Sequence, residues 1–298
     1  SAWAMDTDIF LLDEPTANLD SAATQQLKEI LLALKNQGKT LLLSEHRLYY
    51  LTDIADEYWV MADGEIKGKY TAAKARALST EQRQTLSLRT LDLAEITVPE
   101  KEPPPKTAPA ALAVSDVRYT YGRKAGDTLS GVSFSVREHE IVGLVGANGC
   151  GKTTIGKLIA GLYRPSGGKI SLFGKPQNPK QLQKRVLFIL QEAEFQFFTS
   201  SVLHELQYGH AVTPEFEAKA KDLLKRMDMW DCRDRHPFSL SGGQMQRLTL
   251  MMAYLSDKPV VILDEPTAGQ DAESLERCAK LIREMRKEKT VLIITHDL

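Results

Sequence analysis

The feature that most constrains the fold is a glycine-rich loop between a short apolar run and a helical pattern. The apolar run at 141–145 ends at Gly146, and residues 146–153 spell G-x-x-x-x-G-K-T. Residues 155–160 continue with the apolar spacing of a helix. A strand, a tight glycine turn and a helix N-terminus in this order form a phosphate-binding loop, so we expect a nucleotide to bind here.

The residue types of this loop suit phosphate chemistry. Glycines let the backbone curl until several N–H groups point into one concavity, and a helix beginning near Lys152 directs its positive dipole end there. Lys152 can reach the β- and γ-phosphates, and the Thr153 hydroxyl can ligate Mg²⁺. A glycine turn without a ligand is the alternative, but the flanking strand and helix argue against it. The expected nucleotide-binding residues of the loop are Gly146, Ala147, Asn148, Gly149, Cys150, Gly151, Lys152, Thr153 and Thr154.

The sequence D-E-P-T-A occurs twice, beginning at Asp13 and at Asp264. Each occurrence is followed by a helical pattern and then by a β-rich run that ends near a histidine, His46 or His296. Two copies of a strand–acid–helix–strand–histidine unit indicate an internal duplication.

The duplication also indicates what the first copy lacks. The phosphate loop of the second copy precedes its acid by roughly 110 residues, and the first copy has no room for such a loop. We therefore expect an internal piece of a tandem protein of about 480 residues, truncated at both ends. The expected domains are the C-terminal part of a first copy at 1–95, a proline-rich linker at 96–112, and a second copy at 113–298 that lacks its last ~50 residues.

The acid pair of the second copy fits metal and base chemistry. Asp264 follows four apolar residues, 260–263, and so ends a strand that is buried in a parallel sheet. Beside the phosphate loop, this carboxylate can hold Mg²⁺, and Glu265 can act as the general base for an attacking water. The alternative is an acid pair that only caps the following helix.

A second anion site is predicted at the start of another helix. Residues 239–248 contain the sequence L-S-G-G-Q, whose serine and glycines open a helical pattern. The alternative is an ordinary serine-glycine helix start. The candidate residues are Ser241, Gly242, Gly243 and Gln244.

Weaker patterns predict further elements. Residues 57–70 predict a hairpin that turns at a D-G pair. Polar residues at 71–90 favour one helix, and residues 214–230 and 272–288 have amphipathic helical spacing.

Composition excludes several classes of protein. The net charge of −1 gives no electrostatic reason to expect a nucleic-acid partner. No apolar run approaches the ~18 residues that a membrane span needs. The three cysteines are far apart, which fits neither a disulfide framework nor a zinc site and indicates a reducing cytosol.

Taken in order, the phosphate loop, the L-S-G-G-Q signature, the D-E-P-T block and the closing histidine resemble the ATP-binding cassette (ABC) ATPases. The resemblance covers essentially all of the chain outside the linker, and the signature is its most specific element, because other phosphate-loop families lack it. It implies an α/β P-loop NTPase fold with a mostly parallel core sheet, an antiparallel β subdomain and a helical signature subdomain. It also implies an ATPase that uses ATP and Mg²⁺ and couples hydrolysis to transmembrane transport.

The resemblance assigns roles to single residues. It makes Lys152, Gln191, Glu265 and His296 catalytic, with His296 contacting the γ-phosphate. Gln191 would also touch Mg²⁺, together with Thr153 and Asp264; a surface glutamine is the alternative. Tyr121 would stack on adenine, although a core or edge-strand tyrosine fits nearly as well. The remnants of the first copy's site are Asp13, Glu14 and His46.

A closer resemblance is to the energy-coupling factor ATPases, which drive uptake of vitamins and transition metals. Residues 191–198 and 201–209 resemble the Q-N-P-x-x-Q and V-x-x-E-V-x-F-G segments of that group, and residues 45–47 resemble its duplicated members. Ala193 departs from the pattern, in which proline is usual, and so does Glu138, in a loop where a Gly-Glu pair is common.

The family implies partners and a location. Two cassettes sandwich ATP head to tail, and the Gln191 loop contacts a transmembrane subunit, so we expect a peripheral protein at the cytoplasmic face of the membrane and no nucleic acid. One alternative is a tandem ABC ATPase that acts on ribosomes or DNA. Another is a nucleotide-gated binding module without turnover. Recognition of the transported substrate in this group lies in a separate membrane protein.

Overall fold

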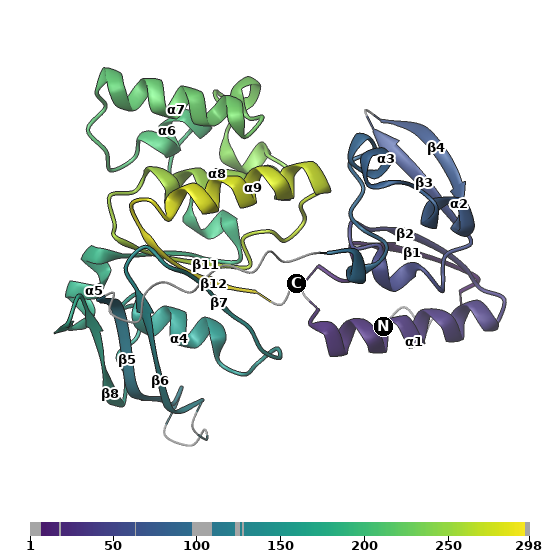
Figure 1. Ribbon diagram of the computed structural model, residues 1–298. Coiled ribbons are helices and arrows are strands. Elements are labelled where there is room, and N and C mark those ends of the chain that lie inside the picture. Colours follow the sequence, from purple (N-terminus) through teal and green to yellow (C-terminus); the bar gives the residue numbers. More distant parts are fainter. Residues whose placement is uncertain are drawn as a thin grey trace. The chain divides into compact units, whose positions relative to one another are not determined.

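The computed structural model describes residues 7–17, 19–62, 64–96, 109–122, 126 and 128–295 (Figure 1). The chain divides into two compact units. One comprises Ser1–Glu100 with Gly269–Leu275, and the other comprises Lys101–Ala268 with Glu276–Leu298. No helix among the described residues combines the length and the apolar character that a membrane crossing requires.

The second unit is built on a four-stranded parallel sheet. Its strands, in spatial order, are β10 (Val186–Ile189), β11 (Val260–Asp264), β12 (Thr290–Ile294) and β7 (Ile141–Leu144). Every residue of β11 is buried, because helices cover both faces of the sheet (Figure 1). Val260 and Ile262 pack into one core, whereas Val261 and Leu263 pack into the other. The uninterrupted apolar run before the acid pair therefore marks a strand buried on both sides.

The core on one face joins the parallel sheet to an antiparallel one. The antiparallel sheet consists of β6 (Leu129–Arg137), β5 (Ala110–Tyr119), β8 (Gly167–Leu172) and β9 (Lys175–Pro176). Helix α4 (Lys152–Ile159) contributes Ile155, Leu158 and Ile159 to this shared core. β5 begins within the segment expected to be linker, because Ala110 already pairs with Arg137 of β6.

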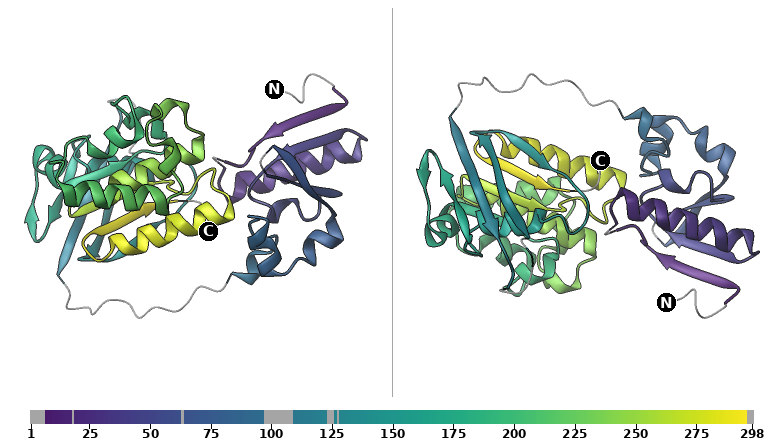
Figure 2. Two further views of the ribbon diagram at one scale, coloured as in Figure 1. Left: turned by 90° about the horizontal axis from the view of Figure 1, so that it is seen from above. Right: turned by 90° about the horizontal axis from the view of Figure 1, so that it is seen from below.

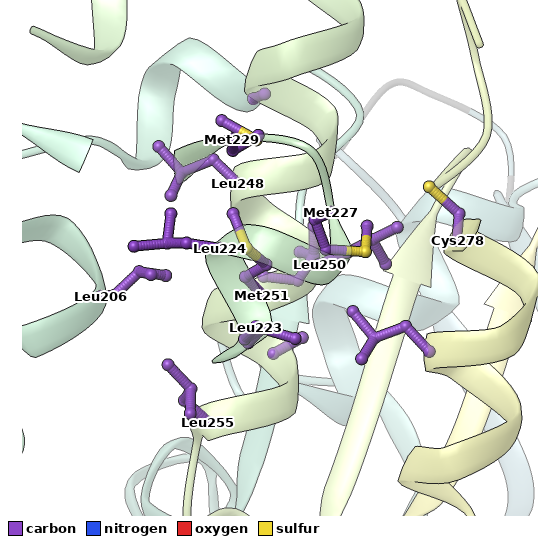
Figure 3. Packing of buried hydrophobic residues seen from close by; sticks show 14 of the residues in the cluster. Leu206, Leu223, Leu224, Met227, Met229, Leu248, Leu250, Met251, Leu255 and Cys278 are labelled. Carbon is purple, nitrogen blue, oxygen red and sulfur yellow. The ribbon is translucent and has the colours of Figure 1, made fainter. Parts of the chain in front are cut away.

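Helices cover the other face of the parallel sheet. They include α8 (Gly242–Leu255) and α9 (Ala272–Met285), while α6 (Val202–Gln207) and α7 (Pro214–Arg226) pack on α8, and α5 (Pro179–Arg185) precedes β10 (Figure 1). Figure 3 shows the leucine and methionine side chains of α6, α7 and α8 packed together. Helices α8 and α9 lie on one side of the parallel sheet, and α4 and the antiparallel sheet lie on the other (Figure 1); Figure 2 shows the first side from above and the second from below. The expected α/β architecture, with a parallel core sheet, an antiparallel sheet and a helical part, is confirmed.

The first unit repeats the strand–helix–strand part of this design. β1 (Ile9–Asp13) pairs in parallel with β2 (Thr40–Ser44), and α1 (Ser21–Asn36) connects them. The predicted hairpin is confirmed as β3 (Glu57–Ala62) and β4 (Glu65–Thr71).

The single helix predicted at 71–90 is wrong. The segment forms two short helices, α2 (Ala72–Arg76) and α3 (Thr80–Thr85). Ser79 starts the second helix with a capping box: its hydroxyl accepts from the Gln82 N–H, and the Gln82 side chain accepts from the Ser79 N–H. The remaining 3₁₀ turns in the described residues are Tyr49–Leu51, Leu93–Glu95, Ala193–Gln196, Trp230–Cys232 and Pro237–Ser239.

Strand β1 differs from β11 in its burial. Ile9 and Leu11 are 64% and 73% exposed, whereas the corresponding Val260 and Ile262 are fully buried. Alternate residues of β1 point to opposite faces, so one face of the β1–β2 sheet packs on its helix and the other presents apolar side chains.

Candidate active site

The glycine loop lies between β7 and α4, as the sequence predicts. Gly151 caps the helix with a φ of 100°, a left-handed conformation that favours glycine. A Cβ atom at Gly151 would lie 2.6 Å from Leu129 Cδ2, so a larger residue would also clash. Residues 146–150 are exposed. The loop thus presents the start of a helix, with its positive dipole end, to an incoming anion.

Lys152 lies over this loop. Its Nζ donates to the Gly146 carbonyl at 2.7 Å and to the Ala147 carbonyl at 3.0 Å. The ammonium group is therefore held at the loop by two backbone acceptors, where it adds positive charge to the helix terminus.

Thr153 and Asp264 meet at the carboxyl end of β11. Thr153 Oγ1 donates to Asp264 Oδ2 at 2.8 Å, although the two residues are far apart in sequence. Asp264 is 2% exposed, and this burial raises the pKa of its carboxyl group, with the Thr153 hydrogen bond opposing the rise and Glu265 adding to it. A hydroxyl and a carboxylate at this distance are two oxygen ligands of the type that Mg²⁺ prefers.

Glu265 is fixed beside them. Its backbone has a φ of 49°, and its N–H donates to the last residue of β12 at 2.8 Å. Its carboxylate accepts from Thr295 Oγ1 at 3.0 Å, and its carbonyl accepts from Gln246 Nε2 at 3.1 Å. Thr295 and Gln246 were not predicted from the sequence, although Thr295 directly precedes the histidine of the repeated block. That histidine, His296, lies outside the described residues.

Tyr121 contacts the loop through its hydroxyl group. Its OH lies 2.9 Å from Oγ1 of the buried Thr154, while the tyrosine itself is 56% exposed. The ring packs edge-on against Tyr119 and Tyr163, which stack on each other with centroids 5.4 Å apart. The two supporting tyrosines were also missed, because ring contacts between distant segments leave no periodic signal.

Gln191 follows β10, the strand next to β11. Ile189 pairs with Leu263, so Gln191 comes after the same sheet edge as Asp264. The adjacent Glu192 makes a small contribution to the raised pKa of Asp264.

Beyond Gln191, a group of exposed aromatic residues is held by a buried carboxylate. Phe195 and Phe198 are 68% and 73% exposed. Glu205, 2% exposed, accepts from the N–H of Phe198 at 3.1 Å and from the N–H and hydroxyl of Thr199 at 2.8 and 2.7 Å. Tyr208 lies beside Phe198, with ring centroids 6.1 Å apart. The buried acid therefore fixes a loop that presents apolar rings to the outside.

The signature residues begin α8, as predicted. Ser241 and Gln244 form a capping box: Ser241 Oγ accepts from the Gln244 N–H at 3.3 Å, and Gln244 Oε1 accepts from the Ser241 N–H at 3.0 Å. Gly242 is exposed in the first turn. The capping box fixes the conformation of this turn.

The first copy repeats the geometry of the acid. Glu14 has a φ of 40°, and its N–H donates to the Ser44 carbonyl at 2.8 Å. Asp13 ends β1 opposite Ser44, and His46 Nε2 lies 3.6 Å from Glu14 Oε1. The structure thus brings Glu14 and His46 together.

Comparisons with known proteins show which proteins this chain is similar to. A family model described as "ABC transporter" matches residues 129–268. A putative ABC transporter ATP-binding protein of Treponema denticola is 34% identical over 303 residues, covering 100% of this chain and 61% of that protein. A putative HMP/thiamine import ATP-binding protein of Bacillus subtilis, YkoD, is 33% identical, and the match covers 99% of this chain and 58% of YkoD. The chain therefore spans less than two thirds of the length of these curated relatives.

A solved structure of an ABC transporter protein is also similar to this chain. The protein cbiO1 of Clostridium perfringens, described as part of the ABC transporter complex cbiONQ, is 30% identical to this chain. Its TM-score is 0.55, and the match covers 63% of this chain and 79% of cbiO1. Residues 129–268, which the family model matches, include the glycine loop, the signature and the acid pair.

Proposed function

Because this chain belongs to the ATPases of ABC transporters, we propose that it binds and hydrolyses ATP for a transporter of the energy-coupling factor type. Such a transporter would import a vitamin or a transition metal through a separate membrane subunit. The observation that carries the proposal is the 2.8 Å contact between Thr153 and Asp264, beside Lys152 and Glu265. Phosphate binding, metal binding and a general base thereby meet at one edge of the sheet.

The loop residues would hold the nucleotide. Lys152 Nζ would exchange the carbonyl oxygens of Gly146 and Ala147 for oxygens of the β- and γ-phosphates, which bear more negative charge. The N–H groups at the start of α4 would bind the same phosphates. Tyr121 would offer its ring to adenine while its hydroxyl contacts Thr154.

Thr153 and Asp264 fit a magnesium ion, with Gln191 as a further proposed ligand. Mg²⁺ characteristically binds one or two carboxylates together with substrate phosphates rather than an all-protein cage, and the two facing oxygens match that preference. When bound, Mg²⁺ supplies charge neutralisation at the phosphates.

Glu265 would accept the proton of the attacking water. Its backbone is held by the hydrogen bond to β12, and Thr295 fixes one carboxylate oxygen, so the acid is oriented before substrate arrives. His296 would contact the γ-phosphate, and this role rests on the family resemblance and on the matching His46.

Partners are proposed on the same grounds. The signature residues Ser241–Gln244 would bind the phosphates of a nucleotide held by a facing cassette, so that the two ABC domains pair around ATP. The Gln191 loop would contact the transmembrane subunit. The exposed rings of Phe195 and Phe198 support this assignment, because a rigid apolar patch next to the site suits a protein partner. The protein would then be peripheral, at the cytoplasmic face of the membrane.

The named relatives favour import over the alternatives. YkoD is named for HMP/thiamine import, and cbiO1 is described as part of a transporter complex. Neither name supports a role on ribosomes or DNA. The intact Glu265 speaks against a binding module without turnover.

Phosphate release from MgATP tests the proposal directly. At protein concentrations high enough for second units to pair, the purified protein should release phosphate, and E265Q should lower the rate at least about 100-fold while MgATP still binds. K152A should weaken MgATP binding itself. Wild-type protein that binds MgATP without releasing phosphate would favour a binding module without turnover. A rate of phosphate release that rises when ribosomes or DNA are added would favour an ATPase that acts on them. Co-purification with a polytopic membrane protein would support the transporter assignment.

A further inference from the structure

The two copies hold their acids in the same backbone geometry but surround them differently. Glu14 and Glu265 both have a positive φ, and each donates its N–H at 2.8 Å to the last residue of the neighbouring strand, β2 or β12. The residue after β2 is Glu45, and the residue after β12 is Thr295. Glu45 and Thr295 therefore occupy the same structural position.

The difference between Thr295 and Glu45 changes the hydrogen bonds that this position makes. In the second copy the Thr295 hydroxyl donates to the Glu265 carboxylate at 3.0 Å. A carboxylate at that position accepts but does not donate, so Glu45 cannot make the corresponding bond. It accepts instead from four donors: Thr16 Oγ1 at 2.6 Å, the His46 N–H at 2.8 Å, the Arg47 N–H at 3.0 Å and the Tyr50 OH at 3.1 Å.

The surroundings reinforce this carboxylate. Thr16 is fully buried in the turn after β1, and the buried Arg47 donates to the Thr16 carbonyl at 3.0 Å. Burial, followed by the charge of Glu45, raises the pKa of Tyr50 far above its usual value, so Tyr50 keeps its proton and remains a donor. The loop after β2 is thus joined to the turn after β1 by both Glu45 and Arg47.

The result of these bonds is a fixed place for His46. Its N–H is bound to Glu45, and its ring Nε2 lies 3.6 Å from Glu14 Oε1. We propose that Glu45 is a positioning residue that fixes His46 against Glu14 and so presets the histidine of the first copy's nucleotide site. The functional part of this inference rests on the proposed ATPase, in which His46 would face the terminal phosphate.

Amide hydrogen exchange on this chain tests the anchor without nucleotide. E45Q removes the charge of the acceptor, and one amide oxygen cannot replace two carboxylate oxygens, so protection of the His46 and Arg47 amides should fall roughly tenfold. The Glu14 amide, bound to Ser44, should stay within about twofold, because the strand pairing does not depend on Glu45. E29Q on exposed α1 is the matched control and should change none of these three amides. Equal loss of protection at all three amides, or unchanged protection at His46, would overturn the proposal.

A second variant covers the case in which E45Q does not fold. Y50F removes one donor from Glu45 and keeps the buried ring, so it should lower protection at His46 and Arg47 by about twofold to fivefold. Unchanged protection in Y50F, if E45Q is unfolded, would overturn the role of this cluster as an anchor.

Turnover of the tandem protein that the duplication predicts tests the consequence for His46. E45Q and H46A should lower turnover by the same factor, and the double variant should be no slower than H46A alone, because both changes remove one function. Further loss in the double variant would show that Glu45 acts by general stabilisation and would overturn the positioning role. An intact protein without any ATPase activity would refute the proposed function instead, while the amide experiment would still decide whether Glu45 anchors His46.

Discussion

Asp264 shows how the site places a charge where folding alone disfavours it. Burial raises the pKa of Asp264, so the folded chain binds a proton there more readily than the unfolded chain does. For a raised pKa in the folded state, stability is complete at low pH and falls as pH rises through that pKa. At neutral pH the ionised, buried Asp264 therefore lowers the free energy of unfolding. The same ionised form is the one that can bind a cation.

This balance predicts the behaviour of D264N without Mg²⁺. Its free energy of unfolding should exceed that of the wild type by about 1 kcal/mol near pH 7, and the difference should shrink toward about pH 4 as the wild-type acid takes up its proton. Urea unfolding across this pH range in a chelating buffer measures the difference. D234N is the control, because the Asp234 side chain is 76% exposed and carries no comparable burial cost. A difference independent of pH would contradict the prediction.

Tyr121 separates two contributions to nucleotide binding. Y121F keeps the ring and loses the hydroxyl contact with Thr154, so it should weaken ATP and inorganic tripolyphosphate alike, by about fivefold. Y121A also loses the ring and should weaken ATP by a further tenfold or so, but not tripolyphosphate, which has no base to stack. Equilibrium titrations with both ligands measure this. Equal affinity of Y121F and wild type for both ligands would show that the hydroxyl contact is irrelevant to binding.

At the scale of elements, local patterns predicted the strands and helices that position the phosphate loop and the acids. The short apolar run at 260–263 predicted a strand buried on both faces, and the glycine loop before a helical apolar spacing predicted the start of a helix; both are present. The prediction of a single helix at 71–90 was wrong, because the Ser79 capping box starts a new helix inside an otherwise uniform polar stretch.

Contacts between elements were much harder to predict. That Thr153 and Asp264 lie together was expected, because both were predicted to serve one magnesium ion, but the hydrogen bond between them was not. The contacts of Tyr121 with Thr154, and of Glu45 with Thr16, join side chains from separate loops. Nothing in the spacing of one segment encodes such a pairing, so only the folded structure reveals it.

The loop after Gln191 gives a prediction at this scale. In E205Q, a buried carboxylate that accepts three hydrogen bonds is replaced by an amide with one accepting oxygen and one donating NH₂ group. An N–H of Phe198 or Thr199 would therefore lose its acceptor. The free energy of unfolding should fall by about 2 kcal/mol, with MgATP affinity unchanged. Thermal unfolding and nucleotide titration measure the two quantities. E194Q, on an exposed residue of the same loop, should leave both unchanged. An E205Q protein as stable as the wild type would mean that the aromatic loop does not depend on this acid.

At the scale of the whole molecule, the second unit carries Lys152, Asp264, Glu265 and a signature, and the proposed mechanism requires each phosphate loop to face the signature of another cassette. This chain alone should therefore bind MgATP but turn it over slowly at low concentration, and its rate per mole of protein should rise with concentration as second units pair.

Complementation between two inactive variants tests the pairing requirement. K152A lacks the phosphate-binding lysine and S241R blocks the signature, so each should be inactive alone. Mixed in equal amounts, half of the pairs combine both variants, and each mixed pair holds one intact site of two, so the mixture should recover about a quarter of the wild-type rate. The rates are measured by phosphate release at protein concentrations where the wild-type rate per mole no longer rises, so that nearly all chains are paired. A wild-type rate per mole independent of concentration, together with no recovery in the mixture, would show that one cassette hydrolyses ATP by itself. If activity returns only when the two variants are mixed, Lys152 of one chain must act with Ser241 of another, because neither variant has both residues intact.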